Sequence, residues 1–138
     1  MKTASTFFIL LTCFACGPDD AAPEAPVNDD FDTDGATVLA SGAFLGVGHT
    51  ASGTATIYES MGKRTVVLDP YSSQNGPDLK VYLSKSDDAS EYVNLGQLKS
   101  TMGKQSYDVP AAVNVNEYPY VLIWCEEFSV LFARAKMN

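Results

Sequence analysis

One cysteine and one histidine are the residues of this chain best suited to redox or metal chemistry. Of three cysteines, Cys13 and Cys16 lie in an N-terminal export signal, so Cys125 is the only thiol expected in the mature domain. Exported proteins usually pair their cysteines. An unpaired one is therefore a reactive thiol, a soft metal ligand or a small buried hydrophobe. Because Cys125 follows the apolar run 121–124, burial fits the sequence as well as reactivity does.

The histidine, His49, lies in the glycine-rich loop 46–50 that leads into a predicted strand. A histidine and a cysteine together could bind a haem iron or another metal, so Cys125 and His49 are the candidate metal ligands. A single histidine excludes a His₂Cys copper centre and most zinc sites built from His and Cys. The competing interpretation is a solvated loop histidine without a ligand.

Three more residues are candidates for ligand binding. Asp78 follows a Gly-Pro pair at the mouth of a strand, where its carboxylate either hydrogen-bonds backbone amides to fix the turn or contacts a ligand. Tyr82 and Trp124 fall in predicted strands, where they either line a pocket or pack across strands. The acidic segment 30–35 spells the first half of a calcium loop. However, Ser41 stands where an EF-hand needs glutamate, so we interpret the segment as part of a linker.

The N-terminus has the features of an export signal. A positive start precedes an apolar run at 7–15, which is far shorter than the ~20 residues that span a bilayer. The run ends in Ala15-Cys16-Gly17 and resembles a bacterial lipoprotein signal, in which the cysteine is lipidated. This predicts a signal peptide over 1–16 and lipidation of Cys16. Cys13, a second candidate for lipidation, stands where that signal usually has a leucine or a similar residue.

An acidic, proline-rich segment follows over residues 17–37. It holds seven acids and no base, and we expect it to be a solvated tether that holds a domain off a membrane. Acids directly after the lipidated cysteine resemble a surface-export signal of some Gram-negative lipoproteins. The resemblance implies attachment to the bacterial outer membrane, on the cell surface or on the periplasmic face.

The charge of the remaining chain excludes one class of function. Residues 38–138 carry ten acids and eight bases, so most of the net charge of −8 lies in the tether. Without a basic patch we expect no nucleic-acid partner. No Gly-x-Ser-x-Gly nucleophile motif is present, and the sequence favours a protein that is not an enzyme.

Short strands separated by turn residues indicate an all-β fold. Strict alternation of apolar and polar residues is clearest at 79–84, and no segment keeps a helical period over ten residues. Residues 87–100 are the only place for a short helix or a structured loop. We predict one small antiparallel β-sandwich or barrel with Greek-key or jelly-roll-like connections. The other predicted strands are 54–58, 64–69, 120–124 and 128–132.

Five segments between Gly42 and the C-terminus resemble the DM13 domain, a small β domain of extracellular and membrane-attached proteins. They occur in family order, and the Gly-Pro-Asp-Leu motif with the Trp-Cys…Phe-Ser-Val…Phe tail is the most specific part. The resemblance implies a DM13-like domain over 38–138 with a redox or electron-transfer role. It attributes that role to Cys125, as a bare thiol or as a ligand to a prosthetic group such as haem. The matching segments are 42–44, 49–57, 76–84, 95–98 and 121–132.

Two classes of function remain open on the sequence. The first is a redox or cofactor-binding module that uses Cys125 and exchanges electrons with a partner in the cell envelope. The alternative is a non-catalytic surface module that binds a glycan or a protein ligand, in which Cys125 is structural. A surface lipoprotein without a small-molecule site is a third interpretation.

Overall fold

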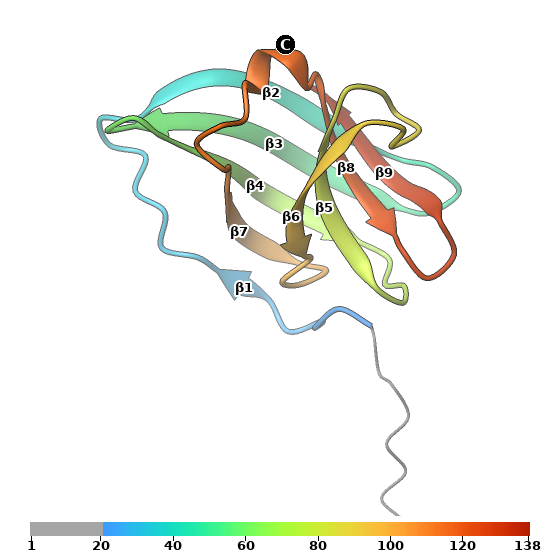
Figure 1. The fold of residues 1–138 in the computed structure, drawn as a ribbon. Helices are drawn as coiled ribbons and strands as arrows, with labels where there is room; N and C mark the ends of the chain where they lie inside the picture. The colour runs from blue at the N-terminus through green and yellow to red at the C-terminus, as the bar shows by residue number, and fades with distance from the viewer. Residues whose placement is uncertain (1–20) are drawn as a thin grey trace, which may run out of the picture.

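Nine strands join in one sheet that curls into a half-barrel (Figure 1). The computed structural model describes residues 21–138, so the signal peptide predicted for 1–16 lies outside the described residues. The all-β prediction is confirmed. No helix in the described part of the chain is long and apolar enough to cross a membrane. The elements are β1 (Val27–Asn28), β2 (Thr37–Gly46), β3 (Ala51–Ser60), β4 (Lys63–Ser73), β5 (Leu79–Ser84), β6 (Tyr92–Gln97), β7 (Gly103–Asp108), the 3₁₀ turn η1 (Val115–Glu117), β8 (Tyr120–Cys125) and β9 (Val130–Lys136).

The strand order across the sheet is β1-β7-β4-β3-β2-β9-β8-β5-β6. All neighbours are antiparallel except β1 and β7, which run parallel. Figure 1 shows the long strands β2, β3 and β4 on one side of the curl, with β5, β6, β8 and β9 on the other. The sequence left a sandwich and a barrel open, and a single curled sheet is the barrel-like solution.

The core fills the inner face of this curl. Alternation along β5 turns Leu79, Val81 and Leu83 inward, and Val121 and Ile123 of β8 lie beside them with at most 2% exposure. The middle of β8 is buried on both faces, as its continuous apolar run predicted. These two strands are therefore the centre of the half-barrel.

Three local predictions were wrong. Strand β4 continues through Pro70, because an irregular register opposite Gly53–Ala55 leaves no ladder hydrogen bond for the missing N–H of proline. The strand predicted for 128–132 begins only at Val130, since Phe128 lies in the β8–β9 turn and is 66% exposed. Segment 87–100 was the predicted place for a short helix or a structured loop, but it holds strand β6 at Tyr92–Gln97, with a loop only before it, and the one helical turn of the described chain is η1.

The N-terminal segment packs against the domain from residue 21 onward, although we expected a solvated tether over 17–37. Val27 N donates to Met102 O at 3.0 Å as β1 pairs with β7, and Ser100 Oγ donates to Ala25 O at 2.7 Å. Residues 17–20 lie outside the described range. The described part of the segment thus adds a strand to one edge of the sheet.

Asp29 is the main polar anchor of this segment. Its carboxylate accepts from Lys99 Nζ at 2.5 Å and from Ser106 N at 2.9 Å. Partial burial raises the pKa of Asp29. The hydrogen bonds from Lys99 and Ser106 lower it by a larger amount, so the net pKa is below its ordinary value. An ionised carboxylate therefore holds the segment at neutral pH.

We predict that Asp29→Ala loosens the N-terminal segment without unfolding the sheet. The change leaves Ser106 N without its acceptor, and a lost hydrogen bond to a charged group is worth about 1.5–3 kcal/mol. Amide hydrogen exchange at Val27 and Asp29 should accelerate at least tenfold, while exchange in β5 and β8 stays unchanged. Uniform acceleration across the domain would contradict the prediction. Asp30→Ala, which alters a neighbouring exposed acid, is the control.

Candidate functional site

Cys125 ends strand β8 and points into the core. It is 1% exposed and belongs to the main apolar cluster, and it is a free cysteine. Its Sγ donates a hydrogen bond to Pro77 O at 2.9 Å. A thiol in this setting is shielded from reagents in solution and ties two chain segments together.

The Gly-Pro-Asp-Leu segment forms the loop that meets Cys125. A Cβ at Gly76 would lie 2.9 Å from the ring of Phe132, so only glycine fits against that side chain without a shift. Asp78 adopts a left-handed backbone with a φ of 55°, and its carbonyl accepts from Glu126 N at 3.0 Å. Together with the Cys125 bond, these contacts fasten the entry of β5 to the exit of β8.

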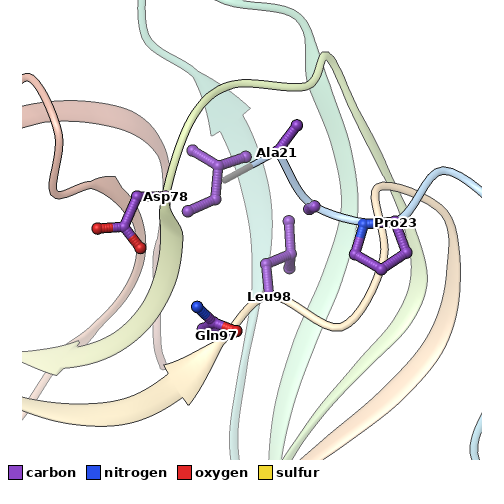
Figure 2. Close-up of a pocket in the computed structure, with 7 residues that line it drawn as sticks. Ala21, Pro23, Asp78, Gln97 and Leu98 are labelled. Carbon is purple, nitrogen blue, oxygen red and sulfur yellow. The ribbon is translucent and has the colours of Figure 1, made fainter. Parts of the chain in front are cut away.

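Asp78 fixes its turn through its backbone and not through the side-chain bonds to amides that we expected. Its carboxylate instead pairs with Lys80 Nζ at 2.6 Å. Asp78 also borders a cavity of about 110 Å³ between the N-terminal segment and strands β5 and β6 (Figure 2). Sites for small organic ligands usually measure about 300–1,000 Å³, so this cavity suits a few water molecules rather than a cofactor. Its lining is Ala21, Ala22, Pro23, Asp78, Leu79, Gln97 and Leu98.

His49 lies in the β2–β3 turn and has partners of its own. Its ring stacks on Phe132 with centroids 3.6 Å apart, and its Nδ1 donates to Val47 O at 3.0 Å. In residues 21–138, no group of three or more His, Cys, Asp or Glu side chains is placed to hold a metal ion.

Haem does not fit the residues that the resemblance offers for it. Cys125 Sγ is packed in the core and bonded to Pro77 O, so a macrocycle would have to displace core side chains to reach it. His49 stacks its ring on Phe132 and bonds Val47 O through Nδ1, so only Nε2 remains for an iron, and Cys125 cannot join it without that displacement.

The outer face of β5 carries a stack of three aromatic rings. Tyr82 lies on this strand between β6 and β8, and its ring is nearly parallel to that of Tyr92, with centroids 4.1 Å apart and planes at 11°. On the β8 side, the ring centroid of Trp124 lies 6.2 Å from that of Tyr82, and the two ring planes make an angle of 21°. Tyr82 is 1% exposed and Tyr92 is 46% exposed, so the stack leads from a buried ring to the surface.

The hydroxyl of the buried ring is hydrogen-bonded to a carboxylate. Tyr82 Oη donates to Glu126 Oε1 at 2.5 Å, and the same oxygen accepts from Asn94 Nδ2 at 3.3 Å. Burial, and then the nearby Glu126 carboxylate, raise the pKa of Tyr82 far above its ordinary value. Tyr82 therefore stays a neutral phenol in the ground state, bonded to a proton acceptor.

The sequence predicted two of the five residues of this cluster. Tyr82 and Trp124 were candidate residues, and the structure brings them together on the face of the sheet opposite the Cys125 thiol. Tyr92, Asn94 and Glu126 were missed as site residues. Alternation along β6 and the position of an acid directly after Trp-Cys were the available signals, but only the strand register shows that they meet Tyr82.

One protein family matches most of the described chain. The model of the family described as electron transfer DM13 matches residues 43–137. The chain belongs to the DM13 family. No curated protein and no solved structure matches the chain. The matched range contains every residue of the aromatic stack and both partners of the Cys125 hydrogen bond, so both lie within the DM13 domain itself.

We predict that the thiol of the DM13 domain is silent in the native state. Because Cys125 is 1% exposed, a chromogenic disulfide should react with it only after the protein unfolds in denaturant. The measurement is a thiol titration of protein whose Cys13 and Cys16 are replaced by serine. One equivalent that reacts rapidly without denaturant would contradict the burial and favour a redox thiol.

Proposed function

We propose that this chain is an exported, lipid-anchored electron-transfer domain whose electrons move through the stack of Tyr92, Tyr82 and Trp124. The observation that carries the proposal is the near-parallel stacking of a buried ring on an exposed one, with centroids 4.1 Å apart. Tyrosine and tryptophan are among the side chains most easily oxidised, and electron tunnelling weakens steeply with distance. Rings in contact therefore give the shortest route between a buried site and a partner at the surface. The family's description as electron transfer supports the same function.

The arrangement of the rings favours this role over a glycan platform. A sugar stacks on an exposed aromatic face, whereas Tyr82 is buried and one of its faces is covered by Tyr92. Tyr92 lies on β6, at the free edge of the sheet, where a protein partner can approach. The partner that this proposal requires is an oxidised metal centre or another strong one-electron oxidant in the cell envelope.

Cys125 enters the proposal as a positioning residue. Its bond to Pro77 and the Glu126–Asp78 backbone bond hold the same loop, so the thiol helps to fix Glu126 beside Tyr82. The competing role, a redox thiol, makes a different demand. It requires Cys125→Ala to abolish electron exchange, whereas a positioning role requires the variant to keep exchange at some cost in stability.

The anchor part of the proposal rests on the N-terminal sequence. Five positions separate Cys16 from Ala21, which contacts Pro77 in an isolated β-bridge. Fully extended, that stretch would span roughly 17 Å. A lipid on Cys16 would thus keep the Gly-Pro-Asp-Leu end of the domain close to the bacterial outer membrane.

We predict that Tyr92→Phe slows oxidation of the protein by a photogenerated ruthenium(III) polypyridyl complex. Phenylalanine keeps the ring stacking but is much harder to oxidise, so the surface end of the route is lost. The measurement is the rate of ruthenium(III) reduction after a laser flash. Trp124→Phe tests the other end of the stack.

Tyr58→Phe is the matched control for this experiment. Tyr58 lies on β3 and packs on Phe31, outside the stack. Equal effects of Tyr58→Phe and Tyr92→Phe would mean that oxidation is not routed through the stack, and the electron-transfer proposal would fail.

We also predict that Cys16 carries the lipid. Bacteria that express the chain and are fed radiolabelled palmitate should label the wild type and Cys13→Ser, and should not label Cys16→Ser. Cys16→Ser should also leave the membrane fraction. Label that depends on Cys13 would move the anchor to the other candidate.

A further inference from the structure

Tyr82 combines two properties that the electron route alone does not explain. Its ring is buried, and its hydroxyl donates the short 2.5 Å bond to the Glu126 carboxylate. A buried tyrosine needs a hydrogen-bond partner, but a backbone carbonyl or an amide would satisfy it. A carboxylate adds the ability to take the proton.

We infer that Tyr82 is a redox-active tyrosine that gives its hydroxyl proton to Glu126 when it is oxidised. The inference rests on the proposed electron transfer and names the residue and the proton acceptor within it. Tyr82 Oη–H breaks as Glu126 Oε1–H forms, and one electron leaves through Tyr92 to a strong one-electron oxidant. The products are a neutral Tyr82 phenoxyl radical, a protonated Glu126 and the reduced oxidant.

Charge is the physical reason for coupling the two transfers. Loss of an electron alone would leave a phenol radical cation, which is a strong acid, hydrogen-bonded to the Glu126 carboxylate, which is a much stronger base than the phenoxyl radical. Transfer of the proton to Glu126 turns a neutral phenol and a carboxylate into a neutral radical and a neutral acid. No new buried charge then forms at either oxygen.

The surroundings of Glu126 suit a proton acceptor that loses its proton again after each transfer. Its backbone N–H is fixed by Asp78 O at 3.0 Å, and its side chain is only partly buried. Exposed Asn94 donates to the same carboxylate oxygen, so the acceptor lies at the border of the protein and water. When the electron returns, the proton can return from Glu126 or be replaced from solvent.

The test is flash oxidation of the full chain by ruthenium(III) with detection of the tyrosyl radical by electron paramagnetic resonance. The wild type should give a neutral tyrosyl radical that is absent in Tyr82→Phe. Glu126→Gln keeps the size and a hydrogen-bond acceptor but is a far weaker base. It should slow radical formation about 100-fold, the usual lower end for loss of a positioned base. The solvent deuterium isotope effect on radical formation should be present in the wild type and lost in Glu126→Gln.

Glu127→Gln is the matched control, because Glu127 is the next residue along the chain and is exposed. It should leave the rate and the isotope effect unchanged. An undiminished radical in Tyr82→Phe, or an unchanged rate in Glu126→Gln, would overturn the inference. Circular dichroism of each variant checks that the fold is kept.

This failure is distinct from failure of the proposed function. If the oxidation rate falls in Tyr92→Phe but is unchanged in Glu126→Gln, the electron route stands and the proton transfer to Glu126 is wrong. If the oxidation rate is also unchanged in Tyr92→Phe, the proposed electron-transfer function is wrong as well.

Discussion

The pairing of β5 with β8 is the constraint on which both the buried Cys125 thiol and the aromatic stack depend. The register sets Leu79 opposite Cys125 and Lys80 opposite Trp124. Because side chains alternate between the faces of a strand, this register sends the thiol into the core and the indole to the outer face. A slip of one residue would turn the thiol to the outer face and the indole to the core. The curl of the sheet then supplies the core that enforces the register.

The outer face of this pair is more buried than the outside of a curled sheet usually is. Leu122 and Tyr82 are almost fully covered, and the ion pair between Arg134 and Asp87 at 2.6 Å fastens the β5–β6 loop to β9 on that side. Because Tyr82 is buried, its hydroxyl would cost free energy without a hydrogen-bond partner, and Glu126 supplies that partner. One contact therefore stabilises the fold and creates the chemistry proposed for it.

Local sequence patterns predicted the strands better than they predicted their ends and their neighbours. The period of two at 79–84 gave β5 with its bounds, because inward and outward residues differ sharply there. Phe128 misled because hydrophobicity alone does not show that a turn ends the ladder. The packing of residues 21–37 was missed because its hydrogen bonds run through the backbone and through Asp29, and composition does not reveal such partners.

The sequence by itself determined the all-β fold, the lone cysteine of the domain and the DM13 resemblance, since periodicity, counting and motif order need no third dimension. Only the tertiary structure decided which candidates meet. It stacked His49 on Phe132, bonded the Cys125 thiol to Pro77 O, and joined Tyr82 to Tyr92, Trp124 and Glu126. The physical reason is that contacts across a sheet follow strand order and register. Both are fixed by long-range hydrogen bonds and core packing between segments far apart in the chain; Tyr82 and Glu126, for example, lie 44 positions apart.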